Sequence, residues 1–247
     1  MESSTDRTAV GGRATVLLVH GAWVTASSWS RVARALNRAG YDARAVQLPE
    51  LDYAQDVAVV RRAVEDVGRT VVLVGHSYGG AVISAAAAGK ALVKALVYVA
   101  AFAPAPDETI ADQLAVFPAL PSAEHLRCDP VTRSVTLEPD AFLAYFAPDL
   151  PRTEARALAG AQPALAVGAT TAKAVNEFGE GGAWSTVPCW YAVSDDDKII
   201  DPRLQVRLAE RMRARQVVHL RSGHASPMSH PHEVAGLIRD AVDASAA

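Results

Sequence analysis

This sequence has little cysteine, no long apolar run and no strong excess of either charge. Its 247 residues include two cysteines, Cys128 and Cys189, which lie far apart and form neither a disulfide framework nor a zinc-binding pattern. The formal net charge is -3 and no basic stretch stands out, which argues against a nucleic-acid partner. No apolar run approaches the length of a membrane span, and residues 1–13 lack the apolar core of a secretory signal. These absences predict a soluble, cytoplasmic protein with no nucleic-acid or membrane partner.

Residues 70–88 carry the strongest functional signal. Residues 70–74 are β-branched and apolar, which is typical of a buried strand, and residues 81–88 are mostly good helix formers. Between them lies the pattern G-x-S-x-G, with Ser77 at its centre, and its two glycines avoid collisions in a tight turn. We predict that Ser77 is a nucleophile held in a strained conformation at a helix N-terminus. The alternative is an ordinary strand-to-helix turn in a nucleotide-type α/β protein.

Short apolar strands alternate with helical patterns along most of the chain. The expected strands cover residues 14–19, 41–47, 70–74, 92–100, 187–193 and 216–220. The expected helices cover residues 29–39, 52–67, 81–88, 203–213 and 231–244. This alternation predicts an α/β fold with a mostly parallel sheet and helices on both faces.

The alternation is interrupted once, in the middle of the chain. The interrupting segment holds most of the prolines, several aromatic residues and short helical patterns at residues 139–146 and 152–159. We predict that it is a helical cap inserted over the end of the sheet; the alternative is a continuation of the main layers. The predicted organisation is a flexible N-terminal tail at residues 1–13, a core at residues 14–103 and 188–247, and a cap insertion at residues 104–187.

Acyl transfer by a serine needs a histidine that takes the hydroxyl proton. In an open parallel sheet such groups gather at the carboxyl ends of the strands. His224 directly follows a predicted strand, so it is our candidate for the base. Five other histidines have positions that favour roles other than that of the base: His20 in the loop after the first strand, His76 inside the turn, His219 within a strand, and His230 and His232 at a helix start.

The run Asp195-Asp196-Asp197 also ends a predicted strand, and one of these carboxylates should orient the histidine. Three adjacent acids cannot all be buried without cost because like charges repel, and the residues alone leave the choice among them open. For the oxyanion hole, the backbone N–H after the serine belongs to Tyr78. We expect the second donor to be Ala22, in the loop after the first strand.

Several segments together resemble the α/β-hydrolase-fold carboxylesterases, above all the branch of plant methylesterases, hydroxynitrile lyases and small bacterial esterases. The matching segments are Val19-His20-Gly21-Ala22-Trp23, Gly75-His76-Ser77-Tyr78-Gly79-Gly80, Ala100-Ala101-Phe102-Ala103-Pro104, Asp196-Asp197-Lys198-Ile199-Ile200 and Gly223-His224. They are spread over most of residues 14–243, and the cap is the least specific part of the resemblance.

The resemblance sharpens three expectations. In this branch the catalytic acid directly precedes a basic residue, which implies that Asp197 is the acid. The lyases carry a lysine after the catalytic histidine and a threonine in the H-G loop, where this chain has Ala225 and Gly21, so hydrolysis is implied over cyanohydrin chemistry. The few residues before residue 14 leave no room for the family's first two strands, which implies a sheet of about six strands.

The sequence therefore predicts an α/β-hydrolase-fold serine carboxylesterase that needs no cofactor and no metal. Small apolar esters would be cleaved through an acyl-enzyme on Ser77, with His224 and Asp197 completing the triad. The residues expected to line the substrate pocket are Trp23, Phe102, Phe117, Phe142, Tyr145, Phe146, Trp184 and Met228. The expected partner is a small-molecule ester, and a homodimer stays open. The alternatives are a lactonase, thioesterase, C–C hydrolase or cofactor-free tailoring enzyme on the same triad, or a ligand receptor or pseudoenzyme.

Overall fold

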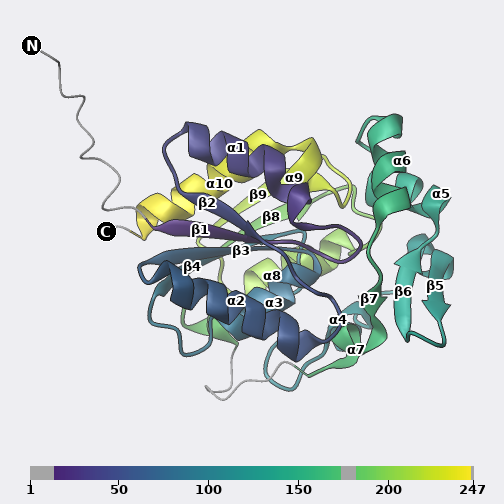
Figure 1. The fold of residues 1–247 in the computed structure, drawn as a ribbon, viewed down its shortest axis with the longest axis horizontal. Coiled ribbons are helices and arrows are strands. Elements are labelled where there is room, and N and C mark those ends of the chain that lie inside the picture. Colours follow the sequence, from purple (N-terminus) through teal and green to yellow (C-terminus); the bar gives the residue numbers. More distant parts are fainter. Residues whose placement is uncertain (1–13, 174–181, 246–247) are drawn as a thin grey trace, which may run out of the picture.

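Six parallel strands form the centre of the computed structural model, which describes residues 14–173 and 182–245 (Figure 1). In spatial order the strands are β2 (Ala43–Val46), β1 (Thr15–Val19), β3 (Val71–His76), β4 (Val93–Val99), β8 (Cys189–Ser194) and β9 (Gln216–Leu220). Every neighbouring pair runs parallel. All residues of β1, β3 and β8 are buried, as expected for parallel strands covered on both faces. The predicted α/β fold with a six-stranded parallel sheet is confirmed.

Helices cover both faces of this sheet (Figure 1). The helices on one face are α1 (Ser30–Arg38) and α10 (Pro231–Ala244), and those on the other are α2 (Tyr53–Val67), α3 (Tyr78–Ala86) and α8 (Pro202–Arg211). Side chains point alternately to the two faces of a strand, so the core divides into two apolar clusters. Leu18 packs in the cluster under α1 and α10, and its neighbour Leu17 packs in the cluster under α2, α3 and α8.

The ends of α2 show how the sequence sets the helix bounds. The side chain of Asp52 accepts hydrogen bonds from the amides of Ala54 (2.9 Å) and Gln55 (3.1 Å), which caps the first turn. Gly68 ends the helix in the left-handed conformation, with φ at 63°. The helix bounded in this way packs against α3.

The chain leaves the sheet after β4 and returns at β8, and the segment between them lies beyond one end of the sheet (Figure 1). Its described elements are α4 (Ile110–Leu114), η2 (Pro121–His125), β5 (Leu126–Asp129), β6 (Ser134–Leu137), α5 (Pro139–Ala141), the π-helical turn η3 (Phe142–Phe146), α6 (Arg152–Ala161), β7 (Leu165–Ala166), α7 (Val167–Thr171) and η4 (Ala183–Ser185). The helical patterns predicted at residues 139–146 and 152–159 are confirmed. The segment also holds a three-stranded antiparallel sheet, β5-β6-β7, that was not predicted. Its strands have two to four residues, and β5 is exposed along its whole length.

Three parts of the predicted organisation lie outside the described residues: the N-terminal tail at residues 1–13, residues 174–181 of the predicted cap, and residues 246–247 of the predicted core. Within the described ranges, none of the helices combines the length and the apolar character needed to cross a lipid bilayer. The cytoplasmic location stays a prediction.

Candidate active site

Ser77 stands at the turn between β3 and α3. Its φ of 53° and ψ of -121° lie in a region that residues with a side chain rarely adopt. A Cβ atom on Gly75 would lie 2.6 Å from the carbonyl oxygen of Gly79, and one on Gly79 would lie 2.5 Å from the carbonyl oxygen of His20. Space therefore requires both glycines, and the strand, turn and helix expected around the serine are present.

A chain of two hydrogen bonds joins Ser77 to His224 and His224 to Asp197. The Ser77 Oγ lies 2.8 Å from the His224 Nε2, and the His224 Nδ1 lies 2.7 Å from the Asp197 Oδ2. Ser77 is 5% exposed, and the other two residues are fully buried. When Nδ1 carries the proton and donates it to the carboxylate, Nε2 is left to accept the proton of the hydroxyl. These contacts fit a serine–histidine–aspartate triad.

The three consecutive aspartates lie in different surroundings. Asp195 and Asp196 are exposed, whereas Asp197 is fully buried. The Asp197 Oδ1 accepts hydrogen bonds from two backbone amides of the following turn, at 2.7 and 3.0 Å. These donors stabilise a buried carboxylate. The geometry thus places Asp197, and neither of its neighbours, beside His224.

Ala22 and Tyr78, whose backbone N–H groups are the predicted oxyanion donors, line the cavity beside Ser77. Neither group donates a hydrogen bond to another described residue. Trp23 directly follows Ala22 with a φ of 65°, and its Nε1 donates to the carbonyl oxygen of Val135 in β6 at 3.0 Å. This bond ties the loop after β1 to the inserted segment. Two unpartnered N–H groups beside a nucleophile, one of them at a helix N-terminus, can hold an oxyanion.

A cavity of about 570 Å³ opens beside Ser77, with walls from both the core and the inserted segment. Its core wall includes Phe102 and Leu204, and its outer wall includes Phe117 and Leu126. Nearly all of the lining is apolar. This volume lies within the range of small-molecule sites, and the apolar lining favours an uncharged ligand.

Residues 16–237 match the model of the Alpha/beta hydrolase family. The chain belongs to this family. The family-level resemblance seen in the sequence is therefore confirmed. The curated protein Alpha/beta hydrolase nvfD from Aspergillus novofumigatus is 27% identical to this hydrolase over an alignment of 254 positions, which covers 92% of this chain and 95% of the fungal protein.

Solved structures of other enzymes share the fold of this hydrolase. A pyrethroid hydrolase from Sphingobium faniae JZ-2 has a TM-score of 0.77 at 22% identity, with 94% of this chain and 98% of the other covered. Polyneuridine aldehyde esterase has a TM-score of 0.78 at 19% identity, with coverages of 92% and 98%. A methylesterase from Arabidopsis has a TM-score of 0.76 at 20% identity, with coverages of 93% and 99%. At these identities the likeness shows the fold.

The structure brings only some of the predicted pocket residues to the cavity of this hydrolase. Trp23, Phe102 and Phe117 line it. Five others do not: Phe142, Tyr145, Phe146, Trp184 and Met228. The lining is completed by aliphatic residues that were not singled out from the sequence, among them Ile110, Leu114, Leu120, Leu126, Leu137 and Leu165.

The five residues outside the lining pack elsewhere for identifiable reasons. Phe142 and Phe146 stack in the core with ring centroids 4.4 Å apart, and the Phe146 ring meets that of His224 edge-on at 5.0 Å. Tyr145 packs against His125 in the inserted segment, at 5.7 Å. The Trp184 Nε1 donates to the carbonyl oxygen of Pro104, at 3.1 Å. Met228 is buried in the core. Aromatic character alone did not separate these roles from pocket lining.

Gln205 of α8 contacts the site and was not found from the sequence. Its Nε2 donates to the Asp197 Oδ2 at 2.8 Å and to the carbonyl oxygen of Ile200 at 2.9 Å. Its Oε1 accepts a hydrogen bond from the amide of Ser194, the last residue of β8, at 2.9 Å. Gln205 is fully buried and so fixes the Asp197 carboxylate relative to the strand. The available signal was a polar residue on the apolar face of a predicted helix.

Two other histidines hold the backbone around the site. The Nε2 of His76 lies 2.8 Å from the carbonyl oxygen of His224, and the Nε2 of His20 accepts a hydrogen bond from the amide of Leu48 at 2.9 Å. Burial lowers the pKa of both imidazoles, that of His76 well below its ordinary value. Both imidazoles are therefore neutral at neutral pH, and their hydrogen bonds hold the neighbouring backbone in place. Of the remaining candidates, His219 and His232 are exposed and His230 is half-buried.

Proposed function

We propose that this hydrolase is a serine carboxylesterase that cleaves small apolar esters. The observation that carries the proposal is the hydrogen-bonded chain from Asp197 through His224 to Ser77, which ends at an apolar cavity. The names of the structural neighbours, a pyrethroid hydrolase and two esterases, agree with chemistry of this class. In this proposal the inserted segment, residues 104–187, caps the cavity and supplies its outer wall.

In the acylation step, the Ser77 Oγ forms a bond to the ester carbonyl carbon while His224 Nε2 takes the hydroxyl proton. The carbonyl electrons move to oxygen, and the N–H groups of Ala22 and Tyr78 stabilise the resulting oxyanion. When the tetrahedral intermediate collapses, the bond to the leaving alcohol breaks and His224 returns the proton to the alcohol oxygen. Asp197 keeps the imidazole in the required tautomer throughout.

In the deacylation step, His224 takes a proton from a water molecule as that water attacks the acyl carbon. A second oxyanion forms at the same two N–H groups and collapses to release the carboxylic acid. Ser77 regains its proton from His224, and the enzyme returns to its starting state.

The cavity supports an apolar substrate larger than an acetate ester. Its volume suits ligands of drug-like size, and few polar groups lie along its wall to bind a charged group. Among the described lining residues the one carboxylate is that of Asp201, which already forms an ion pair with Arg203, with an oxygen-to-nitrogen distance of 2.6 Å. Arg203 in turn lies over the Phe117 ring, 4.6 Å from its centroid. A wall fixed in this way favours alkyl or aryl groups on the ester.

Hydrolysis of a series of p-nitrophenyl esters, from acetate to decanoate, tests the proposal. We expect Ser77→Ala to lower kcat/KM by a factor of about 10⁴ or more, because the nucleophile is lost. Ser28→Ala is the matched control: it removes another buried hydroxyl, one that makes no hydrogen bond among the described residues, and should leave kcat/KM within about twofold. The acyl chain length that gives the highest kcat/KM measures how long an acyl group the cavity accommodates. Turnover that survives Ser77→Ala would refute the proposal.

A further inference from the structure

Two acidic side chains are buried directly behind the oxyanion residues. Asp56 of α2 is fully buried, and Glu50, in the loop before that helix, is 1% exposed. The Oδ2 of Asp56 accepts a hydrogen bond from the phenol of Tyr78 at 2.6 Å, and its Oδ1 accepts one from the backbone amide of Glu50 at 3.0 Å. The esterase mechanism above uses neither carboxyl group.

The hydrogen bonds decide which of the two acids carries the charge. Burial raises the pKa of Asp56, but the hydrogen bonds that its two oxygens accept, from Tyr78 and from the Glu50 amide, counteract part of that rise, so Asp56 is the better stabilised anion of the two. Neither carboxyl oxygen of Glu50 has a hydrogen-bond partner among the described residues, and its nearest histidine contact is with neutral His20, whose Nδ1 lies 3.7 Å from the Glu50 Oε1. Burial, and then the charge of Asp56, raise the pKa of Glu50 to about 9. At neutral pH, Glu50 is therefore protonated, and a single negative charge faces the Tyr78 phenol.

Tyr78 connects this buried charge to the reacting atoms. Its phenol ends at Asp56, the residue lines the cavity, and its backbone N–H lies beside Ser77. Because Tyr78 is the first residue of α3, its N–H has no acceptor within the helix that would fix its direction. An O–H···O⁻ bond of 2.6 Å between buried groups is short and strong, so it restricts how residue 78 can turn.

We propose that Asp56 is a positioning residue: through the phenol of Tyr78 it fixes the orientation of the Tyr78 N–H that stabilises the oxyanion. The inference rests on the proposed esterase function and adds to it. It also assigns the Tyr78 side chain a part in catalysis, beyond filling the wall of the cavity. The tyrosine hydroxyl and the Asp56 carboxylate act as one unit, so removal of either should have the same effect.

Tyr78→Phe and Asp56→Asn test this assignment. We expect each to lower kcat for the best p-nitrophenyl ester about 10- to 100-fold with little change in KM, which is somewhat less than the loss of a whole oxyanion donor. The double variant should be no slower than the slower single variant, because the two groups act as one unit. Rates are expressed per active site, counted by labelling with a fluorophosphonate, so that a misfolded fraction does not enter.

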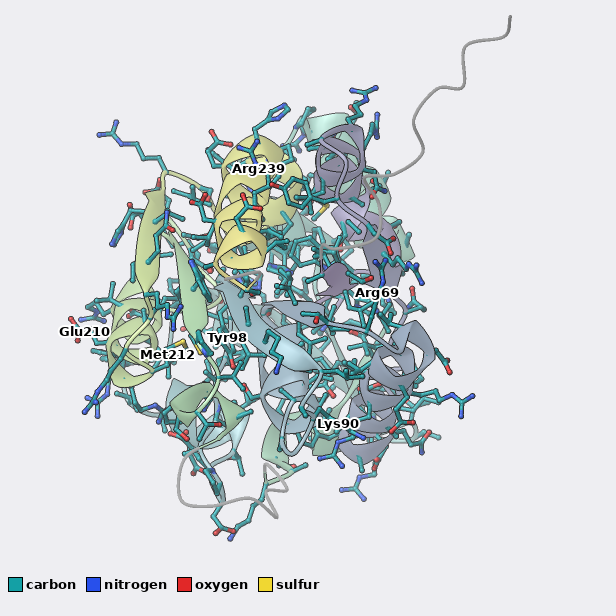
Figure 2. All side chains as sticks on the ribbon, turned by 90° about the vertical axis from the view of Figure 1, so that its left-hand side faces the viewer. Arg69, Lys90, Tyr98, Glu210, Met212 and Arg239 are labelled. Atoms are coloured by element: carbon teal, nitrogen blue, oxygen red, sulfur yellow. The ribbon has the colours of Figure 1, made fainter. Side chains whose placement is uncertain are left out.

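Tyr98→Phe is the matched control. Tyr98 lies on β4 (Figure 2). It is fully buried, its phenol oxygen lies 2.8 Å from the Ser84 Oγ, and it is not among the residues that line the cavity. Its loss removes a buried hydroxyl contact of the same kind. We expect it to lower the temperature of unfolding while leaving kcat per active site within about twofold.

Binding of an alkyl trifluoromethyl ketone separates positioning from mere support. Such a ketone adds the Ser77 oxygen to its carbonyl carbon and leaves an oxyanion in the hole, whereas the matching alcohol only fills the cavity. We expect Tyr78→Phe to weaken binding of the ketone by the same factor by which it lowers kcat, and to leave the affinity for the alcohol unchanged.

Two results would overturn the proposal: equal losses of affinity for the ketone and the alcohol, or equal losses of kcat in Tyr78→Phe and Tyr98→Phe. If Asp56→Asn does not fold, the kcat and the ketone affinity of Tyr78→Phe alone test the proposal. Failure of the proposed esterase function would appear separately, because Ser77→Ala would then hydrolyse the esters as fast as the wild type does.

Discussion

At the scale of single residues, hydrogen-bond donors decide the role of each buried acid. Asp197 and Glu50 are both almost completely buried. Asp197 accepts hydrogen bonds from two backbone amides and from the side chains of Gln205 and His224, so it can stay ionised and orient the imidazole. Glu50 receives no such bond within the described part of the chain, so it keeps its proton. The same residue class thus gives an orienting anion in one place and a neutral group in the other.

Glu50→Gln should make the stability of the protein less dependent on pH. Because the pKa of Glu50 rises from its ordinary value near 4.5 to about 9 on folding, the unfolded chain releases this proton at a lower pH than the folded protein does. Wild-type stability should therefore be highest, with respect to this group, below about pH 4.5 and should fall as pH rises toward about 9. Thermal unfolding across this range measures the effect. We expect the variant to unfold about 5 °C or more above wild type at pH 8 and at nearly the same temperature at pH 5. A constant difference at both values would contradict a protonated Glu50.

At the scale of elements, the loop after β1 has no spare room beside Ser77. A Cβ atom on Gly21 would lie 2.6 Å from the Cβ of Ser77 and 3.1 Å from the carbonyl oxygen of His76. Gly21→Ala must therefore displace the loop and, with it, the N–H of Ala22. We expect kcat for p-nitrophenyl esters to fall about 100-fold, as when an oxyanion donor is lost.

The matched control for this loop is Gly160→Ala on α6, where an added Cβ atom meets no atom within 4 Å. It should keep the wild-type kcat and slightly stabilise its helix, because alanine has the higher helix propensity. Stopped assays on both variants at equal active-site concentration make the comparison. An unchanged rate for Gly21→Ala would contradict the placement of the oxyanion hole in this loop.

The elements that could be predicted from the sequence are those whose structure is determined by a short stretch of neighbouring residues. Continuous apolar runs mark the buried parallel strands, and two glycines around Ser77 mark a turn that only glycine permits. The sheet β5-β6-β7 escaped prediction because its strands are short and partly exposed, which leaves a weak apolar pattern. Gln205 escaped because its importance depends on Asp197, which only the folded chain brings to it.

At the scale of the whole molecule, the fold gathers four distant parts of the chain at one end of a parallel sheet. Ala22, Ser77, Asp197 and His224 each follow a strand of this sheet, β1, β3, β8 and β9 respectively (Figure 1). Ligand sites of open parallel sheets lie at the carboxyl ends of the strands, which is why inspection of strand ends led to His224, to the loop of Ala22 and to the run of three aspartates. The choice of Asp197 within that run came from the family resemblance, and Ser77 was marked by its G-x-S-x-G motif. No comparable rule predicts which residues line the pocket. Its residues come largely from the inserted segment, so Leu126 and its aliphatic neighbours were missed while buried aromatic residues were chosen.

The most direct measurement of the central claim is to trap the acyl-enzyme. The protein is mixed with p-nitrophenyl butanoate, quenched in acid within the first turnover, and examined by intact mass and peptide mapping. We expect one butanoyl group on the peptide that contains Ser77, an equivalent burst of p-nitrophenol, and neither signal in Ser77→Ala. An acyl group found elsewhere, or ester turnover with no acyl adduct and no dependence on Ser77, would contradict the assignment of Ser77 as the nucleophile.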